Sequence, residues 1–414
     1  MKTEQEVMST EHDKRKYKLN IYKAYLFQFI LGIHTVRAVY YIYMTEWGGL
    51  SFFEQMILQS YFWLMIFVLE IPSGAIADYL GRKKALIFSA LTVILAAFTY
   101  SITPFIFLFY IAETLWAFSI SLISGTDEAF IYSSLKVSGE EDKLPKVMGN
   151  MRVMNLIALT ISAPLGSLIY AYVSLQFTMT CLGLIYIGAF ITSLTYHEPK
   201  FNNKIKSERY LSILKDGFKE LKKNKILRIL CFDRLFINIL IFLLFWTWQP
   251  YLDALGIPPN LWINEEVSIP LWGIILAIMN LTNASLAFSF PRILKKFKRK
   301  IYFLIIIDII NGFAFIFLGL TTNPILGVII LLFIVGFGYP RFLIYMHGIN
   351  KQIESENRAT VLSTINMFQS LLFAVLYPIM GYLVETWSVY WFFIINGILI
   401  LIITMFTRVK SEYL

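Results

Sequence analysis

The chain has 414 residues, of which 57% are hydrophobic and 15% are charged, and its mean hydropathy is +0.65. This balance lies far outside that of soluble globular proteins and leaves no room for a sizeable water-soluble domain. The net charge of +9 sits in short loops, where membrane topology and anionic lipid headgroups account for it, so nucleic-acid binding is excluded as the main role.

Apolar segments of the length that crosses a bilayer as a helix, about 20 residues, recur along the whole chain. Alternating apolar and polar strands of the membrane-barrel type are absent from the sequence, so helices are expected. The predicted spans of the first half are 24–44, 56–77, 85–102, 105–123, 155–173 and 177–195. Those of the second half are 229–251, 269–290, 302–320, 324–346, 361–384 and 391–406. The sequence therefore predicts an all-α membrane protein with twelve transmembrane helices.

Lys and Arg residues fall in alternate loops, on one side of the predicted membrane, and the loops of the opposite side contain none. Because basic residues resist translocation, this pattern predicts that both termini are cytoplasmic. Residues 1–20 are polar and lack a cleavable signal pattern, so the first span is expected to direct insertion into the cell membrane.

The longest internal polar stretch divides the chain into two halves of six spans each. We expect a first bundle over residues 1–200, a cytoplasmic linker with an amphipathic helix over 201–228, and a second bundle over 229–414. An Arg at the cytoplasmic start of a span, followed by a Pro/Gly pair, occurs at the same place in each half. These residues are Arg152, Pro164 and Gly166 in the fifth span, and Arg358, Pro378 and Gly381 in the eleventh.

The loop between the second and third spans reads Gly74-Ala75-Ile76-Ala77-Asp78-Tyr79-Leu80-Gly81-Arg82-Lys83-Lys84. It resembles the loop signature G-x-x-x-D-x-x-G-R-[KR]-[KR] of the major facilitator superfamily. Its glycines permit a tight turn, and Asp78 and Arg82 are capable of charge-assisted hydrogen bonds. We expect Gly74, Asp78, Gly81 and Arg82 to form a conformational latch, although Lys83 and Lys84 also fit a purely topological role.

Further segments are similar to bacterial efflux-type members of that superfamily. They are Glu70-Ile71-Pro72-Ser73-Gly74, Ser124-Gly125-Thr126-Asp127-Glu128-Ala129, His197-Glu198-Pro199, Trp248-Gln249-Pro250-Tyr251-Leu252 and Arg358-Ala359-Thr360-Val361. The resemblance implies two pseudo-symmetric six-helix bundles, and it implies Asp127 as the partner of Arg82. One departure is Glu113, which stands where the family often carries an Arg in its fourth helix.

Ionisable residues inside membrane spans are costly and are therefore functional candidates. The candidates for proton coupling or substrate binding are Arg37, Glu70, Glu113 and Asp308. Arg37 and Glu113 are predicted at a similar depth, where they either face one another as a coupling pair or form a static buried ion pair. Glu70 fits a structural brace equally well, while Asp233, Arg234 and Arg341 lie nearer the interface and are expected to snorkel.

Aromatic residues make up 17% of the chain, and a cavity lined by some of them would suit an apolar or amphipathic substrate. The cavity candidates are Trp116, Trp246, Trp248, Gln249 and Asn280. Most other aromatic residues are better explained by lipid contact. No metal site is expected, because the two cysteines and the lone histidines lack ligand spacing, and no cofactor is expected.

The leading hypothesis is a proton-coupled secondary transporter that exports a small drug-like or amphipathic compound by alternating access. Transport driven by ATP is not expected, since no phosphate-binding loop for ATP occurs in the sequence.

The alternative is import of a nutrient such as a sugar or organic acid. The sequence argues against it, because neither half shows the paired Arg expected for a small anion. A membrane enzyme or sensor ranks lower, because no catalytic motif and no output domain is present. The expected partners are the substrate, protons and the lipid bilayer, and a monomer is expected.

Overall fold

The computed structural model describes residues 11–199, 219–297, 299–339, 341–353, 358–406, 409–410 and 412. The first half contains α1 (Glu11–Gly32), α3 (Phe52–Leu80), α4 (Arg82–Ile102), α5 (Ile106–Ile123), α6 (Thr126–Ser138), α7 (Leu144–Tyr172) and α8 (Leu175–Leu194). The second half contains α10 (Lys225–Phe242), α11 (Leu244–Ala254), α12 (Leu271–Leu294), α13 (Lys300–Leu320), α14 (Pro324–Gly338), α15 (Arg341–Lys351), α16 (Arg358–Thr386) and α17 (Val389–Met405). Four short helical turns lie between these helices, and they are η1 (Arg37–Val39), α2 (Tyr40–Ile42), η2 (Tyr43–Trp47) and η3 (Glu141–Lys143). A small hairpin consists of β1 (Leu261–Trp262) and β2 (Ser268–Ile269).

The helices have the length and polarity that a bilayer requires. Within the described residues, nine helical segments are long and apolar enough to cross a membrane, and α14 and α17 are shorter apolar helices. The first predicted span is α1 with the short helices after it, and the first part of α1 is polar and basic. The twelve predicted spans all correspond to helical segments, and the all-helical membrane fold is confirmed.

The predicted spans differ in how continuous their helices are. The first leaves the helix after Gly32 and resumes at Arg37, and the seventh consists of α10 and α11 with a single turn residue, Leu243, between them. The fourth span of the first half ends at Ser124, where Gly125 adopts a φ of 71° that glycine tolerates without steric cost. In the tenth, α14 ends at Gly338 and α15 begins at Arg341. The fourth predicted span itself is continuous as α5, and its chain continues after the turn as α6.

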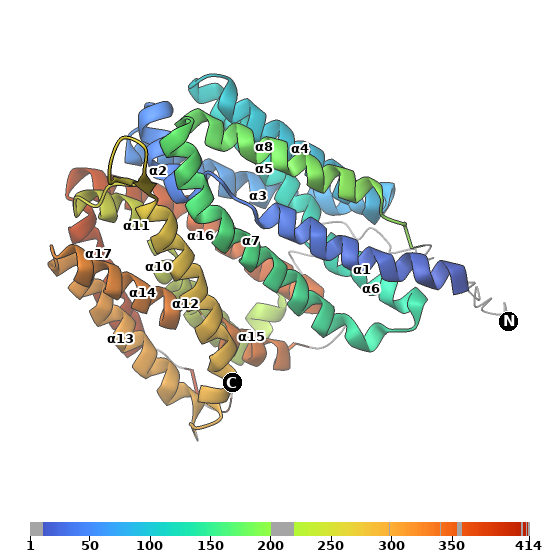
Figure 1. The fold of residues 1–414 in the computed structure, drawn as a ribbon. Coiled ribbons are helices and arrows are strands. Elements are labelled where there is room, and N and C mark those ends of the chain that lie inside the picture. The colour runs from blue at the N-terminus through green and yellow to red at the C-terminus, as the bar shows by residue number, and fades with distance from the viewer. Residues whose placement is uncertain are drawn as a thin grey trace.

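The two halves meet along two helix pairs, α3 with α16 and α7 with α12 (Figure 1). Glycine allows the close approach in each pair. A Cβ on Gly273 of α12 would lie 2.5 Å from Cα of Pro164, and one on Gly381 of α16 would lie 2.8 Å from Cβ of Met56. Pro164 and Gly381, one from each repeated Pro/Gly site, thus lie where the halves contact one another, which suits a rocking interface, whereas Gly166 packs against Thr35 of its own half.

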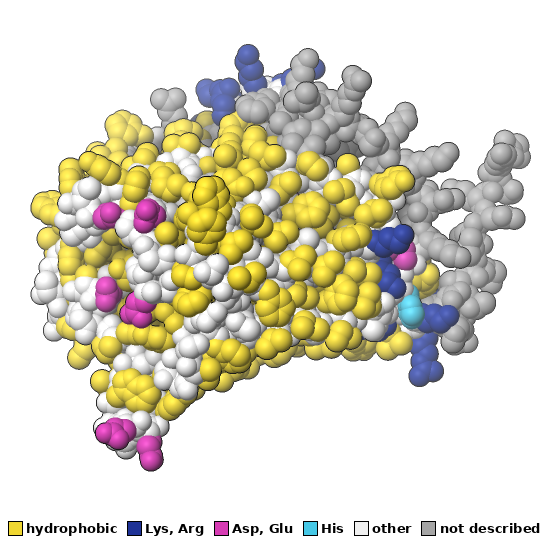
Figure 2. All heavy atoms as spheres, turned by 90° about the horizontal axis from the view of Figure 1, so that it is seen from above, with side chains coloured by type: hydrophobic (Ala, Val, Ile, Leu, Met, Phe, Trp, Pro, Cys, Tyr) yellow, Lys and Arg dark blue, Asp and Glu magenta, His cyan; other side chains and the backbone are white. Residues whose placement is uncertain are grey.

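Charge separates the two ends of the molecule. Figure 2 shows an apolar belt, with Asp and Glu at one end and Lys and Arg away from it. We call the end that carries Glu46, Glu54, Glu265 and Glu385 the acidic end, and the end that carries Lys18, Arg82, Lys143 and Arg292 the basic end. The predicted domain limits stay predictions, and most of the predicted linker, 200–218, lies outside the described residues.

In this conformation the halves are joined toward the acidic end. The backbone N–H of Phe53 donates to Oε2 of Glu385 at 2.8 Å. The Tyr172 hydroxyl donates to the carbonyl of Glu266 at 3.1 Å and accepts from the N–H of Ser268 at 2.8 Å. Further hydrogen bonds between the halves lie beside the central cavity, and Figure 1 shows the far ends of α1 and α13 pointing apart.

Candidate functional site

A cavity of about 250 Å³ lies between the two halves near the middle of the apolar belt. The residues around it come from the interrupted first span, α3, α5, the α10–α11 break and α16, and many are aromatic. They include His34, Arg37, Tyr40, Gln55, Gln59, Trp63, Tyr100, Glu113, Trp116, Phe245, Trp246, Trp248, Gln249 and Tyr377. Four of the five predicted cavity residues, Trp116, Trp246, Trp248 and Gln249, therefore line this space.

Glu113 is the one carboxylate among the described lining residues of this cavity. Its side chain is buried, and Oε1 accepts hydrogen bonds from Nε2 of Gln59 at 2.7 Å and from the Tyr100 hydroxyl. Gln59 also donates to the hydroxyl of Tyr40 at 2.8 Å. The carboxyl group is thus held by neutral donors on α3 and α4, an arrangement in which it can carry either a charge or a proton.

Arg37 lines the same cavity but does not pair with Glu113. Its guanidinium lies over the ring of Phe245, 4.5 Å from the ring centre, and its buried Nε has no hydrogen-bond partner. No ion pair of Arg37 is found within the described part of the chain. The facing pair expected from helical depth is not formed, because the chain unwinds between Gly32 and Arg37 and turns the guanidinium toward the second half.

A second cavity, of about 340 Å³, adjoins the first on its basic side. The two cavities share His34, Arg37, Phe242, Phe245 and Trp248. Polar residues of α7 and α12 line this second space, and they are Arg152, Asn155, Asn280 and Asn283. Asn280, the fifth predicted cavity residue, therefore belongs to the second cavity, and its buried Nδ2 has no partner.

Gln249 closes the first cavity toward the acidic end. Its Oε1 accepts from the backbone N–H of Tyr41 at 2.7 Å, and its Nε2 donates to the carbonyl of Arg37 at 2.7 Å. Both bonds join α11 to the turns that follow the break in the first span. Trp246 lies against Tyr40 across the same interface, with ring centres 5.4 Å apart. Gln249 and Trp246 thus act as contacts between the halves as well as lining residues.

The loop between α3 and α4 makes contacts within the first half only, as far as it is described. Gly81 has a φ of 92°, and the guanidinium of Arg82 donates to the carbonyl of Ala129 at 2.6 Å and to the hydroxyl of Ser133. Glu198, which follows α8, accepts from the backbone N–H groups of Arg82 at 3.2 Å and Lys83 at 2.6 Å. This places a carboxylate at the N-terminus of α4, where the helix dipole favours it.

Asp127 is not the partner of Arg82 in this conformation. Its Oδ2 instead accepts from Nε2 of Gln28 on α1 at 3.2 Å. The turn at Gly125 directs the first residues of α6 toward α1 and the next turn toward α4, which separates the predicted pair. Gly74 lies on α3 with open space beside it, and the Asp78 side chain lies outside the described residues.

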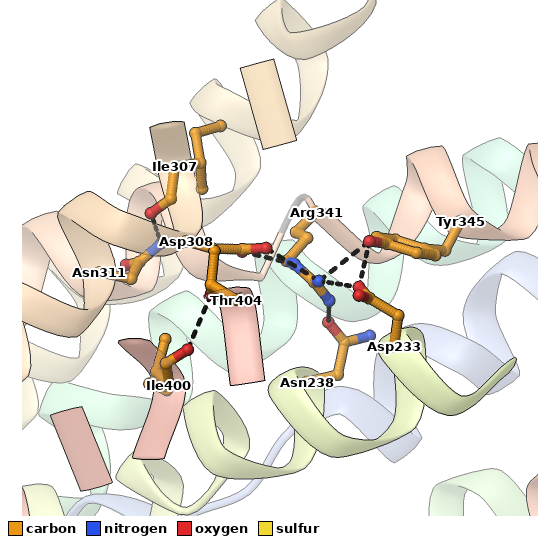
Figure 3. Close-up of polar contacts among 9 residues, drawn as sticks. All are labelled: Asp233, Asn238, Ile307, Asp308, Asn311, Arg341, Tyr345, Ile400 and Thr404. Atoms are coloured by element: carbon orange, nitrogen blue, oxygen red, sulfur yellow. Dashed lines mark hydrogen bonds and ion pairs between the residues drawn. The ribbon is translucent and has the colours of Figure 1, made fainter. Parts of the chain in front are cut away.

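Glu70 and Asp308 are placed outside both cavities. Glu70 Oε1 accepts from the hydroxyl of Ser124 at 3.2 Å, at the break between α5 and α6, so its contact fits the structural brace. Asp308 belongs to a buried cluster in the second half (Figure 3). There Arg341 donates through Nε to Asp308 Oδ1 at 2.6 Å and through Nη2 to Asp233 Oδ1 at 2.6 Å.

The same cluster corrects the expectation that Asp233 and Arg341 snorkel. The Arg341 side chain is 0% exposed, and Nη1 also donates to Asn238 at 3.2 Å while Nη2 contacts the Tyr345 hydroxyl at 3.1 Å. The partners of Arg341 come from α10, α13 and α15 itself, so its guanidinium lies inside the bundle. Depth along an ideal helix gave no sign of this direction.

Several site residues were not identified as such from the sequence. Gln59, Tyr100 and Glu198 hold predicted residues in place, and Arg152 was noted only as part of the internal repeat. A signal was present for Gln55 and Gln59, two amides one helical turn apart in an apolar span. Gln59 is 54 residues from Glu113 along the chain, and Glu198 is 116 residues from Arg82. Tyr100 is only 13 residues from Glu113 but lies on the preceding helix, so all three contacts depend on helix packing.

Comparisons with known proteins place the chain in a family. The sequence profile of the Major Facilitator Superfamily matches residues 25–349 and 259–412, and the chain belongs to this superfamily of membrane transporters. A comparison with curated protein sequences finds no match.

Solved structures with the same fold cover nearly the whole chain. A mutant of the nucleoside transporter NupG superposes with a TM-score of 0.77 at 15% identity, over 95% of this chain and 100% of that one. A D-xylose-proton symporter gives a TM-score of 0.71 at 12% identity, over 96% and 99%. A POT family transporter in complex with 5-aminolevulinic acid gives 0.72 at 15%, over 95% and 96%. The fold of two pseudo-symmetric six-helix bundles is confirmed.

Proposed function

We propose that this protein is a proton-coupled secondary transporter that exports a small amphipathic organic compound by alternating access. The observation that carries the proposal is the first cavity, an aromatic chamber between the halves that contains one acidic side chain, Glu113, among its described lining residues. Aromatic walls provide a large apolar contact area for a substrate, and a few polar groups orient it. We further propose that the basic end is cytoplasmic, in the cell membrane, and that the monomer is the transporting unit.

Glu113 is the coupling site in this proposal. Coupling requires a group that binds a proton and whose environment changes between the two states. Glu113 receives hydrogen bonds from Gln59 on α3 and Tyr100 on α4, and it lies beside the interface that must open. Glu70 and Asp308 are less suited, because neither lines either of the two cavities described above.

Export is proposed from the sequence segments that resemble efflux-type members, and import is the second candidate. The observation that favours import is the amide lining of the two cavities, Gln55, Gln59, Asn155, Asn280 and Asn283, which also suits a hydroxylated substrate. Transport into oriented vesicles separates the two. With an outward-directed proton gradient, an antiporter accumulates substrate inside, whereas a symporter accumulates it only when the gradient is reversed.

Glu113→Gln provides the direct test of the coupling site in proteoliposomes. We expect the variant to bind substrate and to exchange it across the membrane, but to lose gradient-driven accumulation, because the amide cannot be protonated in this pH range. Glu54→Gln is the matched control, since it makes the same change on an exposed residue of α3. Full gradient-driven accumulation by Glu113→Gln would rule out this coupling site.

A further inference from the structure

We infer that the second cavity is an anion-binding subsite, and that the substrate is an organic anion whose aromatic or apolar body occupies the first cavity. The inference rests on the proposed transport function and adds the charge of the substrate to it. It starts from the two arginines, Arg37 and Arg152, that line the second cavity.

Arg37 has no protein partner for its charge among the described residues. Its Nε is buried without a hydrogen bond, and its guanidinium is in contact with the face of Phe245. Removing a cation from water without a counter-charge is costly, so such a group in a transport pathway indicates a ligand that supplies the charge. An aromatic ring beside a guanidinium does not use its N–H donors, which stay available for a carboxylate or a phosphate.

Arg152 adds a second cation to the same wall. It projects from α7, and no ion pair or hydrogen bond of its side chain is found in the described part of the chain. Asn280 and Asn283 of α12 lie on the opposite wall, and Asn280 offers an unused amide N–H group. None of the described residues that line this cavity is acidic. Two cations and an unused amide donor, without an acid, are groups that recognise an oxyanion.

The residues that border both cavities explain why the ligand is expected to have two parts. Phe245 and Trp248 border both spaces, so a molecule that extends past them places one end among the arginines and the other among the aromatic residues of the first cavity. Import of a small anion was disfavoured from sequence because no half shows paired arginines. The break in the first span places Arg37 in the cavity that Arg152 also lines, and it removes that objection.

The test measures binding rather than transport, so it is separate from the test of proton coupling. Quenching of tryptophan fluorescence in lipid nanodiscs is recorded with 4-phenylbutyrate, 4-phenylbutyramide and 4-phenylbutylamine, which share one skeleton and differ in charge. We expect the carboxylate to bind at least tenfold more tightly than the amide and the amine. Inorganic phosphate, added at constant ionic strength, distinguishes a site for any small anion from one for an amphipathic anion.

Arg37→Gln and Arg152→Gln are each expected to weaken binding of the carboxylate about tenfold and to leave the amide unchanged, as loss of one charged hydrogen bond predicts. Arg292→Gln is the matched control, because it removes the same charge from a residue that lines neither cavity. Equal binding of the three compounds, no binding of the carboxylate, or unchanged binding in both cavity variants would overturn the inference. Phosphate binding as tight as that of the carboxylate would overturn the two-part ligand. Charge-selective binding without pH-driven transport would instead contradict only the proposed coupling.

Discussion

Arg341 is the residue whose removal should cost most, because it compensates two buried carboxylates at once. Arg341→Ala would leave Asp233 and Asp308 without their shared cation in the interior of the second bundle. Breaking a buried ion pair by removing one partner costs about 3–5 kcal/mol. We therefore expect a clear fall in the thermal unfolding midpoint of the purified protein.

Two further variants separate charge from packing in this cluster. Arg292→Ala, on the exposed end of α12, should leave the unfolding midpoint unchanged. Adding Asp233→Asn and Asp308→Asn to Arg341→Ala should recover part of the lost stability, because neutral amides cost less to bury than unpaired carboxylates. An unfolding midpoint equal to that of the unaltered protein in Arg341→Ala would show that the cluster contributes no net stability.

At the scale of the elements, the contact between α3 and α16 is expected to keep the two halves closed at the acidic end. Gly381→Leu would place a side chain against Met56 and against the backbone of Phe53, which lies 3.0 Å from the position of its Cβ. Overpacking of this kind costs about 1–3 kcal/mol, and here the cost falls on the state in which the two helices touch. The equilibrium should therefore move toward opening at this end.

Labelling of a cysteine in the cavity measures that shift. With Cys181 and Cys231 replaced by serine, a thiol introduced by Gln55→Cys should react about tenfold faster with a reagent supplied from the acidic end in the Gly381→Leu background, as a shift of about 1.4 kcal/mol implies. Gly149→Leu is the control, because no atom lies within 4 Å of the added Cβ. Equal labelling rates in the two backgrounds would contradict control by this contact.

For the molecule as a whole, transport should require the acidic end to separate. Phe53 and Tyr382 lie on opposite halves with ring centres 6.5 Å apart. A short thiol-reactive bridge between Phe53→Cys and Tyr382→Cys is expected to stop transport, and a reducing agent that cleaves the bridge should restore it. Full transport with the bridge intact would exclude rocking of the halves about the central cavity.

The proposed orientation is tested on intact cells with a maleimide that does not cross membranes. Glu265→Cys, in the hairpin at the acidic end, should be labelled from outside, whereas Lys143→Cys, at the basic end, should react only after the cells are permeabilised. The expectation follows from the distribution of Lys and Arg between the two ends. The reverse pattern would place the acidic end in the cytoplasm and would contradict the proposed orientation.

Hydrophobic segment length and loop charge determined the class of protein, the number of spans and the two-half arrangement, because these depend on local transfer free energies that are encoded along the chain. The sequence also identified Glu113, Trp116 and Trp246 as candidates, since polar and aromatic residues in apolar spans can be recognised without knowing the direction of their side chains.

The tertiary structure alone decided which of these residues meet. Arg37 turns away from Glu113 because the first span unwinds after Gly32, and Arg341 joins Asp233 and Asp308 because α15 packs beside α10 and α13. Such arrangements are stabilised by contacts with other helices, so no periodicity within one span reveals them. The position of a side chain along an ideal helix predicts its depth in the membrane, but its direction and partners follow from packing between spans that are distant in the sequence.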